Sequence, residues 1–181
     1  MTDYGTYLSY HLHYSGDRTD RTHLYKDQNE ILPQKIQNDF QRSRSCSEVT
    51  EFAVCMFDCD DLKYINDKYG HEKGDEYLKT ATRLICKIFK HSPVFRIGGD
   101  EFISILKDED FDIYEELIAK FEAETEAVNK AALHEWECIN LSFGLAEYNP
   151  HTDKSVEDTA SRADKLMYEN KRERKSGRKV R

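Results

Sequence analysis

The stretch "VFRIGGDEFISIL", from Val94 to Leu106, places two glycines and two acids between apolar segments. The segments "VFRI" and "EFISIL" predict two strands, and the short stretch between them predicts a turn. In a two-residue hairpin turn, glycines adopt positive φ angles without steric strain. The stretch therefore predicts a β-hairpin that carries the carboxylates of Asp100 and Glu101 beside its turn.

Two more strands and several helices are predicted around this hairpin. The run "TEFAVCMFDCD" (residues 50–60) predicts a strand that is buried on both faces and ends in acids. The run "CINLSFGLAEY" (residues 138–148) predicts the fourth strand. Helices are predicted at residues 61–70, 74–91, 111–133 and 155–175. The β-α-β-β-α-β order predicts an α/β (α+β) fold with a ferredoxin-like core, a mixed antiparallel sheet and helices on one face.

The residues before the first strand are expected to add helices at the N-terminal end. Tyrosines and leucines recur at helical spacing within residues 4–14, so we expect the N-terminal segment of residues 1–18 to be a linker or a short leading helix. A further helix is predicted at residues 23–42. The sequence contains no internal repeat, so we expect one domain at residues 19–178 and a tail at 179–181.

The composition is typical of a soluble domain and narrows the possible functions. Hydrophobic residues make up 38% of the 181 residues, charged residues make up 34%, and the net charge is −8. An acidic chain lacks the basic footprint of a general nucleic-acid binder, so no nucleic-acid partner is expected. No apolar run is long enough for membrane insertion, and no secretory leader is evident. The five cysteines lack CxxC spacing, which indicates reduced thiols in a cytoplasmic protein.

Three acids, Asp58, Asp60 and Asp61, cluster where the first predicted strand ends. Asp58 and Asp60 point the same way if the strand continues, because side chains alternate along a strand. Clustered carboxylates repel each other unless a cation lies between them, and hard oxygen ligands suit Mg²⁺. We assign Asp58 to the metal. Asp60 is expected to cap the following helix, and Asp61 is expected in its first turn.

The predicted hairpin is expected to pair with this acid-ending strand in a ferredoxin-like sheet. Asp100 and Asp58 would then face each other across neighbouring strands, with Cβ atoms about 5 Å apart. Two segments would thus supply one split pair of carboxylates. Metal-assisted phosphoryl or nucleotidyl transfer needs such a pair to hold the triphosphate and the attacking oxygen.

The same stretches resemble a known family over residues 19–178. The resemblance is carried by "FDCDDLKYINDKYGHEKGD" (Phe57–Asp75), "RIGGDEF" (Arg96–Phe102), "INLSFGLA" (Ile139–Ala146) and "ADKLMYENK" (Ala163–Lys171). They are similar to the GGDEF family of diguanylate cyclases, nucleotidyltransferases whose fold is similar to the polymerase palm and the nucleotidyl cyclases. The resemblance implies condensation of two GTP into cyclic di-GMP, with release of two pyrophosphates, by a homodimer of facing half-sites. It also implies an upstream sensor domain or protein.

The resemblance assigns the chemistry to particular residues. Asp58, Asp100, Glu101 and the backbone carbonyl of Cys59 would hold Mg²⁺ (or Mn²⁺). Asp100 would also help to deprotonate the attacking 3′-hydroxyl, with Glu101 as a second candidate base. Lys63 would neutralise charge that develops on the phosphates, although an exposed helical lysine is equally typical of a solvated surface.

The remaining assignments concern the nucleotide. Asn66 and Asp75 would read guanine, since a carboxylate accepts hydrogen bonds from a donor edge that adenine lacks. Without a ligand, Asn66 would be a polar residue of a helix surface, Asp75 a helix N-cap or first-turn acid and His71 a loop histidine. The other members of the binding set are His71 near the ligand, Gly98 and Gly99 through backbone N–H groups, and Lys171 and Lys175 as phosphate contacts.

Two stretches depart from the family pattern. In Thr19–Asp27, only Thr22 and Leu24 match the family's opening motif. This departure leaves the alternative of a catalytically inert GGDEF-like domain that binds GTP or serves as a protein-interaction module. The family's inhibitory product site has arginine and aspartate where this chain has Phe89 and Ser92, which predicts no feedback inhibition there.

The regulation of the domain is left open by the sequence. Residues 1–18 are too short for a sensor domain, so we expect either a piece of a longer protein or regulation through dimerisation.

Another alternative function is a polymerase-like nucleotidyltransferase that acts on nucleic acid, but an acidic surface fits that function poorly.

Overall fold

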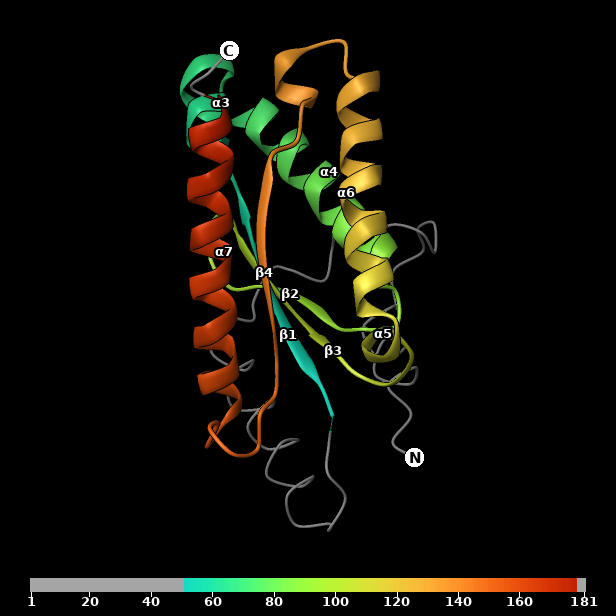
Figure 1. The fold of residues 1–181 in the computed structure, drawn as a ribbon. Helices are drawn as coiled ribbons and strands as arrows, with labels where there is room; N and C mark the ends of the chain where they lie inside the picture. Colours follow the sequence, from blue (N-terminus) through green and yellow to red (C-terminus); the bar gives the residue numbers. More distant parts are fainter. Residues whose placement is uncertain (1–50, 179–181) are drawn as a thin grey trace, which may run out of the picture.

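A computed structural model describes residues 51–178 and contains one four-stranded sheet (Figure 1). The strands are β1 (Ala53–Cys59), β2 (Val94–Arg96), β3 (Glu101–Leu106) and β4 (Leu141–Glu147). Their spatial order is β2-β3-β1-β4, and every neighbouring pair is antiparallel. The predicted ferredoxin-like core is confirmed, whereas the prediction of a mixed sheet is wrong.

The helices follow the predicted order. They are α3 (Leu62–Tyr69), α4 (His71–Ile88), α5 (Asp108–Asp112), α6 (Tyr114–Ala131), the 3₁₀ helix η2 (Glu135–Glu137) and α7 (Val156–Arg178). The predictions for residues 1–50 and 179–181 fall outside the described residues, so the domain boundaries stay predictions. None of the helices in residues 51–178 is both long and apolar enough to cross a bilayer.

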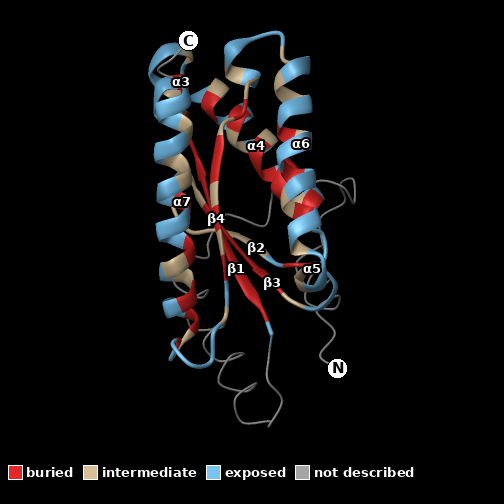
Figure 2. Ribbon diagram, in the orientation of Figure 1, coloured by how far each residue is buried: buried red, intermediate tan, exposed pale blue. Residues whose placement is uncertain are grey.

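Helices cover both faces of the sheet, so the prediction of helices on one face is wrong (Figure 1). Because side chains alternate along β1, Phe57 points to one face and Met56 to the other. Phe57 packs against Phe89 of the α4 end and Phe121 of α6, with ring centroids 5.4 and 5.5 Å apart. Met56 belongs to a second apolar cluster with Met167 of α7. The buried residues therefore lie between the sheet and each helical layer (Figure 2).

Helix α7 packs directly on the backbone of β4. A Cβ atom added at Gly144 would lie 2.1 Å from the backbone nitrogen of Met167 and 2.2 Å from the carbonyl oxygen of Ala163. Such distances are far inside van der Waals contact, so only glycine allows this approach. The side chain of Asn170 also accepts a hydrogen bond from the Phe143 backbone N–H at 3.3 Å. This packing fixes the position of α7, including its lysines.

The entry into α7 is held by a buried carboxylate, Asp153. Its oxygens accept hydrogen bonds from the Asn149 backbone N–H at 3.0 Å and the Thr159 hydroxyl at 2.9 Å. Arg162 pairs with both carboxylate oxygens. Burial alone would raise the pKa of Asp153, but these hydrogen bonds outweigh burial and lower the pKa to about 2.

The Asp153 network predicts a loss of stability in acid. A carboxylate whose pKa is lowered by folding stabilises the native state above its unfolded pKa of about 3.9, and this contribution disappears as the pH falls toward 2. We expect the difference in unfolding free energy between wild type and Asp153→Asn to narrow by about 1 kcal/mol from pH 6 to pH 3. Urea titrations at both pH values measure this difference. Glu122→Gln, at an exposed acid of α6, is the control, and a constant Asp153 difference would contradict the prediction.

Candidate active site

The end of β1 meets the start of β3 with a register that differs from the prediction. The Cα partner of Asp58 on β3 is Glu101, not Asp100. The backbone N–H of Cys59 donates to the carbonyl oxygen of Asp100 at 2.8 Å, so Asp100 lies one position beyond the paired strands. The predicted facing pair of Asp58 and Asp100 is therefore wrong. The two acids belong to the same end of the sheet, offset by one residue.

The hairpin turn is longer than the predicted two-residue turn. The backbone N–H groups of Ile97 and Gly98 both donate to the carbonyl oxygen of Glu101, at 3.0 and 3.4 Å. Neither Gly98 nor Gly99 has a positive φ angle, which corrects the predicted reason for the glycines. A Cβ atom at Gly98 would lie 2.8 Å from Glu101 Oε2, and at Gly99 it would meet nothing within 4 Å. The glycines thus leave space for a carboxylate and for an approaching ligand.

Arg96, which is not among the predicted site residues, holds the turn. Its Nε donates to the carbonyl oxygen of Gly98 at 3.1 Å, and its guanidinium also donates to the carbonyl oxygen of Gly99. A basic residue at the end of the first hairpin strand was the available indication, because a glycine-rich turn exposes carbonyl groups that an arginine can bind.

Asp60 and Asp61 have structural roles, although not those predicted. The Asp60 carboxylate accepts a hydrogen bond from the Ser142 hydroxyl at 2.5 Å, and its backbone carbonyl accepts one from the Tyr77 hydroxyl at 2.6 Å. The N-cap of α3 is Asp61, with φ 67° and no side-chain cap, so the prediction of Asp60 as the cap is wrong. Asp61 instead accepts a hydrogen bond from the Asn140 side chain at 3.1 Å.

A lysine from α7 neutralises the acids at the end of β1. Lys171 Nζ lies 2.6 Å from Asp58 Oδ1 and 3.5 Å from Asp60 Oδ1. Burial raises the pKa of Glu101, and the negative charges of Asp100 and Asp58 raise it further. The acids at this end of the sheet therefore repel one another, and an added positive charge would stabilise their ionised forms.

The side chain of Cys59 takes no part in this charge cluster. It is 1% exposed, and burial raises the pKa of its thiol well above the usual range. A neutral, buried thiol is a poor metal ligand. Only the backbone carbonyl of Cys59 is chemically suited to a hard cation.

Five of the predicted residues line one pocket of about 640 Å³. They are Cys59, Lys63, Asp100, Lys171 and Lys175. The other lining residues are Asp60, Asp61, Leu62, Tyr64, Asp67 and Lys68. The pocket thus combines acids from the sheet end with four lysines from α3 and α7, and Asp58 joins it through its ion pair with Lys171. Such a lining suits an anion that brings or shares a cation.

The residues predicted to read guanine are not among those that line this pocket. Asn66 on α3 packs against α4, since a Cβ atom at Gly74 would lie 1.9 Å from Asn66 Oδ1. His71 is the exposed first residue of α4, not a loop residue. The N-cap of α4 is Gly70, so Asp75 lies within the helix, exposed, and the alternative of an N-cap aspartate is wrong.

The structure holds no preformed cation cage among the residues it describes. Within residues 51–178, no three carboxylate, imidazole or thiol groups converge as a metal site. Lys63 is also turned outward, with its Nζ 3.2 Å from Asp67. The site therefore has the right donor types, with Asp58 engaged by the ammonium group of Lys171.

The positions of the family's product site are used by the fold itself. Phe89 is fully buried and packs in the aromatic cluster with Phe57 and Phe121. The Ser92 hydroxyl donates to the carboxylate of Asp110 at 2.7 Å. Neither side chain is available to bind a phosphate or a guanine.

Comparison with known proteins shows which family this chain belongs to. The family model described as "Diguanylate cyclase, GGDEF domain" matches residues 24–177, and the chain belongs to this family. Diguanylate cyclase DosC of Escherichia coli is 34% identical over 125 residues, which cover 68% of this chain and 27% of that protein. Biofilm architecture maintenance protein MbaA of Vibrio cholerae is 31% identical over 180 residues, covering 93% and 22%. The chain thus spans about a quarter of the length of these relatives.

Solved structures share the fold. The active GGEEF domain of a diguanylate cyclase from Vibrio cholerae has a TM-score of 0.63 and 27% identity, covering 77% of this chain and 90% of that chain. The GGDEF domain of DgcB from Caulobacter crescentus, solved in complex with c-di-GMP, has a TM-score of 0.64 and 22% identity, covering 77% and 81%. The second likeness shows the fold alone.

Proposed function

We propose that this chain is a diguanylate cyclase domain that condenses two GTP molecules into cyclic di-GMP and releases two pyrophosphates. Each subunit of a homodimer would bind one GTP, and the two half-sites would face each other. The observation that carries the proposal is one pocket lined by Asp100 and by Lys63, Lys171 and Lys175, residues from three separate segments. A triphosphate needs cationic groups, and its reaction needs a carboxylate.

We assign Mg²⁺ (or Mn²⁺) to Asp58, Asp100, Glu101 and the carbonyl oxygen of Cys59. These are hard oxygen donors of the kind that both ions prefer. In the structure the ammonium group of Lys171 supplies the positive charge at Asp58, and it would have to move to the phosphates for the ion to take its place. When bound, the ion would polarise the phosphates and lower the pKa of the attacking hydroxyl.

The chain's own residues would perform the remaining steps. Asp100 would accept the proton of the 3′-hydroxyl, with Glu101 as a second candidate, as the new oxygen–phosphorus bond forms and the bond to pyrophosphate breaks. Lys63, Lys171 and Lys175 would stabilise the charge on the phosphates. The Vibrio cholerae structure is described as an active GGEEF domain, so we infer that a carboxylate, rather than aspartate itself, is required at position 100.

Backbone groups and two polar side chains would orient the nucleotide. Gly98 and Gly99 would bring N–H groups close to phosphate oxygens. A Cβ atom at Gly99 would meet nothing within 4 Å, so its backbone is open to approach, whereas the Gly98 N–H would have to leave or share its 3.4 Å hydrogen bond to the Glu101 carbonyl oxygen. Asn66 and Asp75 would bind the guanine edge, with His71 nearby. We further propose a cytoplasmic location and an upstream sensor domain or protein that controls dimerisation.

The test is direct synthesis. Purified protein is incubated with GTP and Mg²⁺ or Mn²⁺, and the nucleotide products are separated and identified by mass spectrometry. The proposal expects cyclic di-GMP and pyrophosphate. The ion pair between Lys171 and Asp58 favours a second candidate, an inert domain in which that lysine keeps the cation out. No dinucleotide product at high protein concentration would support the inert domain.

The proposed enzyme is expected to lack product inhibition at the usual place. Phe89 lies in the core, and the Ser92 hydroxyl is hydrogen-bonded to Asp110, so neither side chain can bind cyclic di-GMP. Initial rates with added cyclic di-GMP, up to low micromolar concentration, should match those without it. Strong inhibition in that range would show that another surface binds the product.

A further inference from the structure

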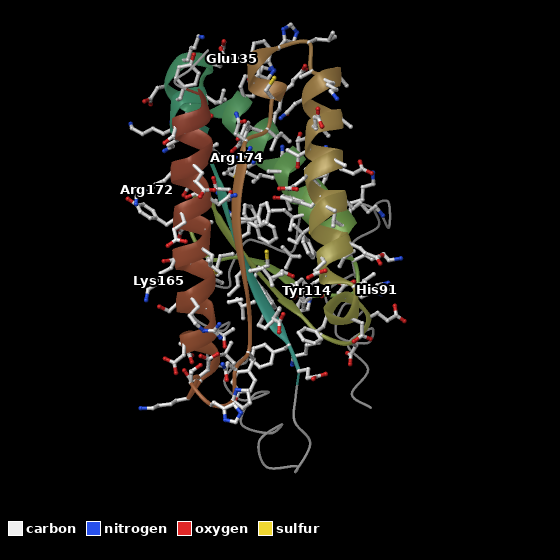
Figure 3. All side chains as sticks on the ribbon, in the orientation of Figure 1. His91, Tyr114, Glu135, Lys165, Arg172 and Arg174 are labelled. Atoms are coloured by element: carbon white, nitrogen blue, oxygen red, sulfur yellow. The ribbon has the colours of Figure 1, made fainter. Side chains whose placement is uncertain are left out.

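The 3₁₀ helix η2 reaches across to α3 with a network of polar contacts. Glu135 accepts hydrogen bonds from Lys68 at 2.7 Å and Tyr64 at 3.2 Å, and it also accepts one from Tyr69. The same Lys68 donates to the Tyr64 hydroxyl at 2.6 Å. The hydrogen bonds from Lys68 and Tyr69 lower the pKa of Glu135 to about 2, so this carboxylate is charged at neutral pH. Figure 3 shows Glu135 at the end of the molecule where α3 lies.

The neighbouring Trp136 joins η2 to both helices. Its ring packs edge-on against Tyr69 of α3, with centroids 4.9 Å apart. Lys73 of α4 places its Nζ 5.3 Å from the Trp136 ring centroid, within the range of a cation–π contact. The ring of His134 stacks on the same indole at 4.3 Å.

The η2 segment is itself held in place. The Glu137 carboxylate accepts hydrogen bonds from the Leu133 and His134 backbone N–H groups, at 2.8 and 3.0 Å. The side chain of Asn129 on α6 bonds both the N–H and the carbonyl group of Ile139, at 2.7 and 2.8 Å. A segment anchored in this way can support the helices that it contacts.

One residue joins helices α3 and α4, and Asn66 packs against α4 at Gly74, so the contacts from η2 add to this direct packing. Gly70, with φ 88° and ψ 161°, is the only residue between Tyr69 and His71. Asn66 lies before this joint and Asp75 lies after it. Two groups on different helices can grip one base only if the angle between the helices is fixed.

We propose that Glu135 and Trp136 form a brace that fixes the joint between α3 and α4, and are positioning residues for guanine recognition. The inference rests on the proposed function, because it takes Asn66 and Asp75 as the guanine contacts. The brace should act on the base more than on the phosphates. Of the residues assigned to the phosphates or the metal, Lys63 lies on α3, whereas Asp100 and Lys171 lie outside both braced helices. Loosening it should reduce discrimination between guanine and adenine more than it reduces turnover.

The experiment measures equilibrium binding of α,β-methylene GTP and α,β-methylene ATP to the full chain. For Trp136→Ala and Glu135→Gln we expect guanine affinity to fall about 10-fold, which is about 1.4 kcal/mol, and adenine affinity to fall by less than about 3-fold. Trp136→Phe keeps an aromatic edge and should restore most of the affinity. The matched control is Leu133→Ala, because Leu133 is 87% exposed beside the same segment.

The possible outcomes separate the brace from the proposed function. Unchanged guanine affinity in both variants, or equal losses for guanine and adenine, would overturn the brace. If the wild type binds neither nucleotide, the proposed function fails and the brace fails with it. Thermal unfolding of each variant reports its folding, and Glu135→Gln tests the brace even if Trp136→Ala fails to fold.

The unmutated chain offers a second measurement, since Trp136 is its single tryptophan. If the brace and the base site are coupled, α,β-methylene GTP should change the tryptophan emission in a saturable way. The ATP analogue should leave the emission unchanged at the same concentrations. Constant emission across a range that saturates guanine binding would contradict the coupling.

Discussion

Asp100→Ala should abolish cyclic di-GMP synthesis, with a loss of at least about 1000-fold in turnover, because in the proposed mechanism this one carboxylate serves both the metal and the proton transfer. The fold should survive this change. Asp100 connects to β1 through its backbone carbonyl, which accepts the Cys59 N–H at 2.8 Å and is retained in alanine. Mass-resolved product formation from GTP measures the loss, and thermal unfolding confirms the fold.

Two variants make the Asp100 result specific. Asp100→Glu keeps a carboxylate in the same pocket, and we expect its activity to stay within about 10-fold of wild type. Asp112→Ala removes an exposed acid on α5 and should leave the rate unchanged. Turnover that persists in Asp100→Ala would remove this residue from the mechanism and leave Glu101 as the candidate base.

The strands of the site were predictable because their patterns are local. A continuous apolar run marked β1, and two glycines between apolar segments marked the hairpin of β2 and β3. The offset between Asp58 and Asp100 was not predictable in this way, because it depends on how many residues the turn contains. A turn that closes on Glu101 through Ile97 and Gly98 shifts the register by one residue.

Contacts between residues far apart in the sequence could be predicted only from the family resemblance, and some of them could not be predicted at all. Lys171 and Asp58 are 113 residues apart, and no local pattern joins them. The family motif placed Lys171 at the phosphates, but it did not indicate the ion pair with Asp58. No motif or periodicity predicted a role for Glu135 or Trp136. The contacts of both side chains exist only once η2 packs against α3, so the local sequence does not indicate them.

Gly144→Ala should destabilise the fold by about 3 kcal/mol or more, as overpacking that moves backbone can do. The added methyl group would meet Met167 N at 2.1 Å, Ala163 O at 2.2 Å and the Leu166 carbonyl carbon at 2.7 Å. All three atoms are backbone, so no rotamer change relieves the clash and α7 must move away from β4. Urea unfolding at neutral pH measures the loss.

Gly177→Ala is the matched control for this result. Gly177 also lies in α7, yet a Cβ atom there would meet nothing within 4 Å, so alanine should be neutral or stabilise by up to about 1 kcal/mol. A Gly144→Ala variant as stable as wild type would show that α7 is not seated on β4 as described. Because α7 carries Lys171 to Asp58, a displaced helix should also weaken nucleotide binding in whatever fraction stays folded, whereas Gly177→Ala should not.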